Sequence, residues 1–271
     1  MKHQYTKWPV FLIFFLLFFL GACDKKDFTL PVDFTMNFSI NNEPIMGGST
    51  TIDEIGIGLR SIDIRGYREQ GEDVFLTRDF DQGKIFLIKP FSTTVSEEFD
   101  IPQGTYDPIS FLFTFQPDAE ENELIDDILD WLEDMEEGED PEELEDDLGE
   151  IIEDYLEDVD PCIIVKGNFT HNSKTRPFVI VVNDPLSFQI IGENRNGDSV
   201  VVLDKNIVNV GKLQLNPSYW FSAITPSMLD NAHIGVIDDV EYIFLSKYVN
   251  SQIYGAVYNR MEESTTLTIN E

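Results

Sequence analysis

An acidic segment divides this chain of 271 residues into two parts and limits how it can fold. The segment runs from Asp118, directly after Pro117, to Asp160, directly before Pro161, and contains no Lys or Arg. It carries 24 of the 51 acidic residues, so that only −9 of the formal net charge of −33 falls outside it. On both sides, short runs of alternating apolar and polar residues are typical of β-strands. We therefore expect a β-rich body interrupted by one acidic insert.

Apolar periodicity predicts that the insert, residues 118–160, is an ordered helical hairpin. Its apolar residues recur three and four positions apart, which gives each of two helices one apolar face. These faces consist of Leu124, Ile125, Ile128, Leu129, Leu132 and Met135, and then of Leu144, Leu148, Ile151, Ile152, Tyr155, Leu156 and Val159. Gly138 ends the first helix, and Asp140 and Pro141 begin the second. A partly disordered linker is the alternative, because acidic segments are commonly disordered.

The carboxylates of the insert leave three roles open. They could bind Ca²⁺, which prefers oxygen ligands, although Asp134 to Gly138 matches only part of an EF-hand loop. They could also dock a basic protein partner, or only keep the hairpin soluble. The negative charge repels phosphate groups, so we expect no nucleic-acid partner.

The N-terminus is predicted to be a signal peptide. Lys2 and Lys7 precede an apolar run from Val10 to Leu20, which is shorter than the roughly 20 residues that a membrane-spanning helix needs. The run ends in Leu20-Gly21-Ala22-Cys23. This ending resembles the lipobox of bacterial lipoproteins, in which the cysteine is acylated and becomes the new N-terminus.

The lipobox resemblance implies a signal peptide over residues 1–22 and a lipidated tether over residues 23–30, anchored to a membrane at Cys23. A plain signal peptide with an incidental cysteine is the alternative. The charged residues from Asp24 to Asp27 resemble export signals of surface-displayed lipoproteins in some Gram-negative groups. In the sorting scheme of enterobacterial lipoproteins, an Asp directly after the acylated cysteine, here Asp24, instead implies retention at the inner membrane. Both schemes stay open; we expect the outer membrane, with display at the cell surface as a further option.

Residues 31–117 are predicted to form the first β portion. Alternation is clearest over 32–40, and Gly56 and Gly58, inside a strand predicted over 52–65, indicate a bulge or a close backbone approach. The segment Ile101-Pro102-Gln103-Gly104-Thr105-Tyr106 resembles a motif of prealbumin-like sandwich domains in bacterial lipoproteins of unknown function. The resemblance implies a mainly β fold, an antiparallel β-sandwich of the prealbumin or Ig-like Greek-key type, with Tyr106 as a packing residue.

Residues 161–271 are predicted to form the second β portion, with helical turns over 227–232 and 251–261 and a last strand over 265–269. Such a terminal strand could instead be donated to a neighbouring subunit, as in lipoprotein-derived fimbrial subunits. The two β portions could form one composite sandwich or two small ones, and we prefer one composite unit.

Four residues are candidates for a specific role in the second portion. Ser199, in Asp198-Ser199-Val200, resembles an O-glycosylation site of exported proteins in some Gram-negative groups, or is only the shoulder of a hairpin. Tyr219 and Trp220 could stack on a sugar, or could fill the core. Cys162 has no intrachain partner if Cys23 is acylated, and we expect it to be a buried thiol.

The motifs of hydrolases, nucleotide-binding loops and zinc proteases do not occur in the sequence, and three histidines are too few for a His/Cys zinc site. Carboxylate pairs for glycosidase chemistry are uninformative among so many acids. We therefore expect a non-catalytic envelope protein without a cofactor that binds or assembles with an unknown protein or glycan. A fimbrial subunit and a hydrolase of envelope glycans are the alternatives.

Overall fold

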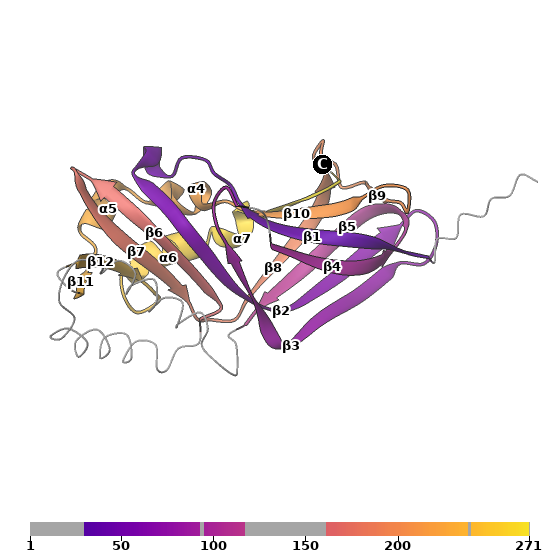
Figure 1. Ribbon diagram of the computed structural model, residues 1–271, viewed down its shortest axis with the longest axis horizontal. Helices are drawn as coiled ribbons and strands as arrows, with labels where there is room; N and C mark the ends of the chain where they lie inside the picture. The colour runs from indigo at the N-terminus through magenta and orange to yellow at the C-terminus, as the bar shows by residue number, and fades with distance from the viewer. Residues whose placement is uncertain (1–29, 93–94, 117–160, 238–239, 271) are drawn as a thin grey trace, which may run out of the picture.

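A computed structural model describes residues 30–92, 95–116, 161–237 and 240–270 (Figure 1). The predicted signal peptide, Cys23 and the predicted acidic helical hairpin of residues 118–160 lie outside these described ranges, and so does any Ca²⁺ site on that hairpin.

The described residues are mostly β, as the sequence predicts, and their strands join into one large sheet. The strands are β1 (Pro31–Ile40), β2 (Thr50–Arg68), β3 (Val74–Ile88), β4 (Val95–Pro102), β5 (Gly104–Phe115), β6 (Ile163–His171), β7 (Lys174–Val182), β8 (Leu186–Asn194), β9 (Val201–Leu203), β10 (Asn209–Leu215), β11 (Ile234–Ile237), β12 (Val240–Leu245) and β13 (Thr266–Ile269). The helical elements are η1 (Met46–Gly48), α4 (Pro217–Trp220), η3 (Phe221–Ala223), α5 (Pro226–Asp230), α6 (Ser251–Tyr258) and α7 (Met261–Ser264).

The sheet is mixed, and this corrects the expectation of a purely antiparallel architecture. Three pairs of strands run parallel: β1 with β10, β7 with β12, and β8 with β13. Alternating apolar residues predict that a strand has one buried face, but they carry no information about the direction of its neighbour. The strands on the two sides of the acidic insert are interleaved, because β1 pairs with β10 and β2 pairs with β6.

The long strand β2 connects two limbs of the sheet. Its first half pairs with β6 and its second half with β5, while β3 follows its opposite edge. One limb continues from β6 through β7 and β12 to β11, and the other continues from β5 through β8, β13, β10 and β1 to β4. The register shifts between Leu59 and Ser61, which confirms the irregularity that the glycines of this strand predict.

The sheet forks at Gly58, where the chain leaves for the acidic insert and returns from it. The amide of Gly58 donates to the carbonyl of Cys162 over 2.8 Å, and the amide of Gln116 donates to the carbonyl of Gly58 over 3.2 Å. A Cβ atom at position 58 would lie 2.9 Å from the backbone carbonyl oxygen of Gln116, so the fork requires a glycine. The described residues on the two sides of the insert, Gln116 and Cys162, therefore both bond to one residue of β2.

α5 and α6 pack on the limb that contains β6, β7 and β12, and α7 lies against β8 (Figure 1). The ring of Phe221 in η3 meets that of Phe178 in β7 edge-on, with 5.6 Å between the ring centroids. Ile253 and Val257 of α6 are buried beside them. Burial of these apolar faces holds helices that are too short to be stable in isolation.

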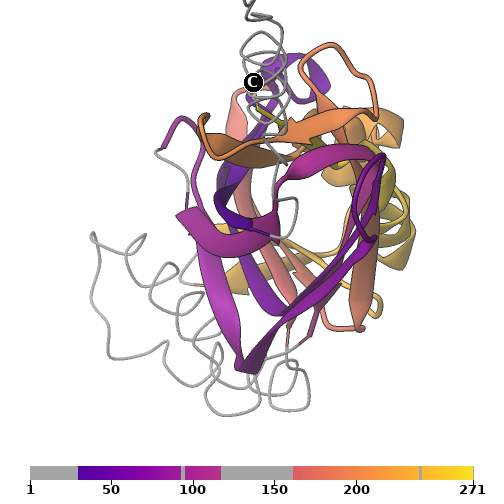
Figure 2. The ribbon, with the colours of Figure 1, turned by 90° about the vertical axis from the view of Figure 1, so that its right-hand side faces the viewer.

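The other limb curls until its last strand, β4, faces β3 on the opposite edge of β2, as the end-on view in Figure 2 shows. The two strands are linked by side chains: the buried Glu97 of β4 accepts hydrogen bonds from Arg78, over 3.5 Å, and from Lys84. A carboxylate with two basic partners can be buried without a large penalty, so these ion pairs secure the meeting of the two edges.

Phenylalanine rings fill the interior of the curled limb. The predicted alternation in β1 is confirmed, since its buried face consists of Val32, Phe34, Met36, Phe38 and Ile40. The ring of Phe34 stacks on Phe111, with 5.9 Å between the ring centroids. Tyr106 also lies in the core, where its hydroxyl donates to the carbonyl of Pro102, and burial raises its pKa to about 12. The packing role expected for Tyr106 agrees with this position.

Candidate functional site

A shallow depression of about 510 Å³ lies between α5 and the start of α6. Its lining is mostly polar and uncharged, and it consists of Ser227, Met228, Asn231, Ala232, Asn250, Ser251, Gln252 and Ile253. α5 begins there because Thr225 caps it, accepting a hydrogen bond from the Met228 amide over 3.3 Å, with Pro226 in the first turn. The sequence prediction of helical turns over 227–232 and 251–261 is confirmed by α5, α6 and α7.

Asn250 holds the two walls of the depression together. Its side-chain oxygen accepts from the His233 amide over 2.7 Å, and its amide nitrogen donates to the carbonyls of His233, over 2.9 Å, and Phe244, over 2.7 Å. The backbone at Asn250 has a φ of 53°, a left-handed conformation that Asn adopts more easily than most residues. One side chain thereby ties the chain after α5 and the end of β12 to the start of α6.

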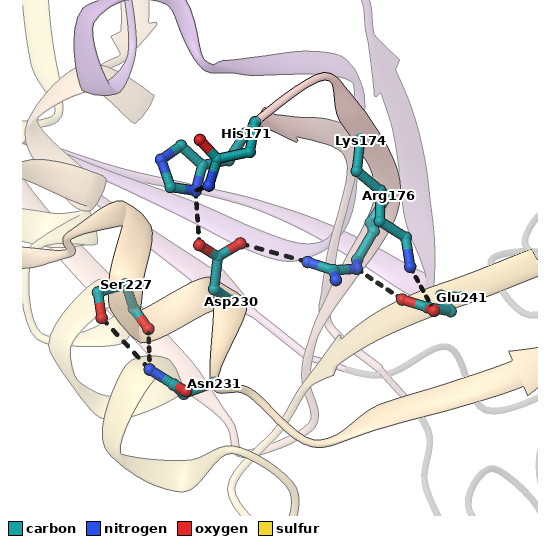
Figure 3. A network of polar contacts seen from close by, with 8 residues as sticks. His171, Lys174, Arg176, Ser227, Asp230, Asn231 and Glu241 are labelled. Carbon is teal, nitrogen blue, oxygen red and sulfur yellow. Dashed lines mark hydrogen bonds and ion pairs between the residues drawn. The ribbon is translucent and has the colours of Figure 1, made fainter.

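A second anchor of this site is a network of charged side chains at the end of the β6–β7 hairpin (Figure 3). Asp230 of α5 accepts from His171 Nδ1 over 2.5 Å and from Arg176 Nη1 over 3.3 Å. Arg176 also donates from Nε to Glu241 of β12 over 2.7 Å, and Lys174 donates to the same carboxylate. Hydrogen bonds from Lys174 and Arg176 lower the pKa of Glu241.

The network fixes α5 against the sheet, and none of its charged residues lines the depression. Asp230 is the last residue of α5, and the side-chain amide of Asn231, the residue that caps the helix, donates back to the Ser227 carbonyl over 2.7 Å. Because carboxylates and basic groups in the network pair with each other, the charge beside the depression is largely balanced. The depression therefore offers hydroxyl and amide groups to a ligand.

His171 and Asp230 have the geometry of a carboxylate that orients an imidazole, as in catalytic dyads. Such a dyad needs a nucleophile within hydrogen-bond reach of the imidazole. Among the described residues, His171 has no hydrogen bond to a Ser, Thr or Cys side chain; its second contact is with Asn172 over 3.3 Å. The pair is explained by its structural role in holding α5.

No family model, curated protein or solved structure matches this chain.

A second charged group is buried within the sheet. Lys166 of β6 lies 3.3 Å from Glu54 of β2, and Lys89 approaches the other oxygen of Glu54 at 3.1 Å. Next to it, Asp53 accepts from the Asn168 side chain over 2.7 Å, and burial, followed by the charge of Glu54, raises the pKa of Asp53. Lys166 and Asn168 join β6 to β2, and Lys89, which follows β3, joins the same carboxylate from the other edge of β2. In the part of the chain that the structure describes, no group of three or more acidic, His or Cys side chains is arranged to hold a metal ion.

The aromatic candidates Tyr219 and Trp220 separate in the structure. Trp220 is 1% exposed, and its indole nitrogen donates to the Ser264 hydroxyl over 2.9 Å, so it belongs to the core and joins α4 to α7. Tyr219 is 44% exposed and is the one of the two that a ligand could reach.

Ser199 and Cys162 are both held by neighbours. The Ser199 hydroxyl donates to Asp107 over 3.0 Å in the turn after β8, and the following strand, β9, pairs with β5. Cys162 is fully buried; its thiol donates to the Asp184 carbonyl over 3.2 Å, and burial raises its pKa to about 12. The expectation of a buried thiol agrees with this environment.

Proposed function

We propose that this protein is a lipid-anchored, non-catalytic binding protein of the bacterial cell envelope, attached to the outer membrane. The ending Leu20-Gly21-Ala22-Cys23 supports the anchor, since it resembles a lipobox. The position of the depression supports binding: α5 lies at the end of the body opposite to the start of β1, from which the chain leads back to Cys23 (Figure 1). An anchor at Cys23 would present the depression away from the membrane. Among the described residues, no helix combines the length and apolar character needed to cross a bilayer.

The observation that carries the proposed ligand class is the uncharged polar lining of the depression. Hydroxyl and amide side chains such as Ser227, Asn231 and Gln252 suit a neutral ligand with many hydroxyl groups, which favours an envelope glycan over an ionic ligand. Tyr248, two residues before Asn250, is well exposed and could stack on a sugar ring.

We further propose that residues 31–117 are related to the prealbumin-like sandwich domains of bacterial lipoproteins. The Ile101-Pro102-Gln103-Gly104-Thr105-Tyr106 segment supports this relation, because it forms the tight connection between β4 and β5 and ends on the buried Tyr106.

The fimbrial alternative is less well supported. The last strand, β13, lies between β10 and β8 and pairs with both inside the chain. Exchange of β13 between subunits would first require it to leave both neighbours.

The anchor and the ligand are tested separately. Metabolic labelling with an alkyne palmitate analogue should mark the wild-type chain and leave the Cys23→Ala variant unmarked. For the ligand, the purified chain is applied to a panel of neutral envelope glycans, and Gln252→Ala should weaken binding severalfold. Gln70→Ala, an exposed amide in the β2–β3 loop at the other end of the body, is the matched control. Equal binding by the two variants would refute the proposed site.

A further inference from the structure

Exposed apolar side chains gather at the end of the body from which the chain leads to Cys23. Leu30 precedes β1, and Ile207 and Val208 precede β10; all three are exposed, Val208 by 82%. Because β1 and β10 run parallel, with Phe34 opposite Asn209, these residues precede the same end of two neighbouring strands. Leu30, Ile207 and Val208, together with Tyr67 and Phe75, are called the anchor-end rim.

Tyr67 and Phe75 extend this rim at the β2–β3 connection. Both are exposed, and their rings meet edge-on with 6.4 Å between centroids. A chain of contacts links them to Leu30: Arg68, next to Tyr67, donates to the Gln103 carbonyl over 3.3 Å, and the Gln103 amide donates to the Leu30 carbonyl over 3.1 Å. The apolar residues thus belong to one end of the curled limb.

We propose that the anchor-end rim rests on the surface of a zwitterionic membrane, with Val208 and its neighbours among the lipid headgroups. This inference depends on the proposed acylation of Cys23. Six residues lie between Cys23 and Leu30, and the seven extended Cα-to-Cα steps span at most about 25 Å, so an acylated Cys23 keeps this end of the body near the bilayer. Exposed aliphatic and aromatic side chains are the kind that enter the membrane interface.

The charge at this end decides which membrane it suits. Glu69, Glu72 and Asp73 lie in the β2–β3 loop beside Arg68, and Asp204 lies beside Lys205 shortly before Ile207, so acidic residues outnumber basic ones at this end. Acidic groups are repelled by anionic lipid headgroups, so attraction between opposite charges cannot hold the rim to an anionic bilayer. Contact with zwitterionic headgroups avoids this repulsion, so insertion of the apolar side chains makes the main contribution to the free energy of membrane binding by the rim.

The test uses the full lipidated chain in zwitterionic phosphatidylcholine vesicles that contain a nitroxide-labelled lipid. An environment-sensitive nitrobenzoxadiazole dye is attached at Val208→Cys, and in a second protein at Phe91→Cys. Phe91 is a matched control, because it is 87% exposed and follows the last residue of β3, whereas Phe75 of the rim lies at the start of that strand. The buried Cys162 does not compete for the dye.

We expect the nitroxide lipid to quench the dye at position 208 at least threefold more than the dye at position 91. A chain that floats with the vesicles but shows equal quenching at both positions would overturn the rim while leaving the anchor intact. A chain that does not float with the vesicles would refute the anchor itself. A blue-shifted dye at position 208 without vesicles would mean that a second copy of the chain covers the rim, and would also overturn the inference.

Discussion

Replacement of Lys166 by Met should destabilise the protein strongly, although the site lies far from the proposed ligand. The Lys166 side chain is 4% exposed, and its Nζ lies 3.3 Å from a Glu54 oxygen. At an effective dielectric constant of about 20, two unit charges at that distance attract each other by about 5 kcal/mol. Desolvation of both groups offsets part of this attraction. Lys166→Met, however, leaves the Glu54 carboxylate buried beside only the exposed ammonium group of Lys89 among the basic groups that contact it in the described structure. We expect a loss of about 3–5 kcal/mol in the free energy of unfolding.

Urea denaturation followed by circular dichroism measures this loss, with a constant denaturant slope as the check on two-state unfolding. Lys89→Met is the matched control: it removes the other cation beside Glu54, but Lys89 is 64% exposed, so we expect less than about 1 kcal/mol. In the double variant Glu54→Leu/Lys166→Met both charges are gone, and most of the stability should return. The reasoning fails if Lys166→Met costs no more than Lys89→Met, or if the double variant is as unstable as the single one.

Three further predictions test the environments of individual residues. Burial raises the pKa of Asp53 above 3.8, so folding disfavours its charged form. Asp53→Asn should therefore raise the melting temperature at pH 7. The gain should disappear below pH 3.8, where Asp53 is protonated in both the folded and the unfolded protein. An equal gain at pH 3 and pH 7 would contradict this. In a Cys23→Ala background, Cys162 of the native protein should resist iodoacetamide at pH 8, because burial raises its pKa to about 12 and keeps the reagent out. It should react once urea unfolds the protein. Rapid alkylation of the native protein would show that the thiol is accessible. Gly58→Ala should cost about 1–3 kcal/mol in the free energy of unfolding, whereas Gly235→Ala, with no atom within 4 Å of its added Cβ, should cost far less; equal urea midpoints would disprove the close approach at the fork.

The local features of the fold were predictable from the sequence because they depend on neighbouring residues. The two-residue period of Val32 to Ile40 predicts the buried face of β1, and the glycines of β2 predict its irregularity. The parallel pairing of β1 with β10 was not predictable, because the pattern within a strand does not identify a partner far along the chain.

The candidate site was hardly predictable for the same reason. Asp230, Arg176 and Glu241 come from three separate elements, and nothing in their local sequence shows that they meet. The aromatic pair Tyr219 and Trp220 illustrates a second difficulty: adjacent residues on one short helical turn point in different directions, and only tertiary packing decides which of them is buried.

The hydrogen bonds at Gly58 allow the acidic insert to be exchanged for another segment without a change to the β body. Since Gln116 and Cys162 both bond to Gly58, the body needs from the connecting chain only that it begin and end at one point of β2. The cost of closing a loop between two such fixed points grows slowly, by about 0.6 kcal/mol for each doubling of the loop length. The number of residues and the charge carried between these two positions can therefore vary without a change in the register of any strand, so this position can acquire or lose a binding function independently of the fold.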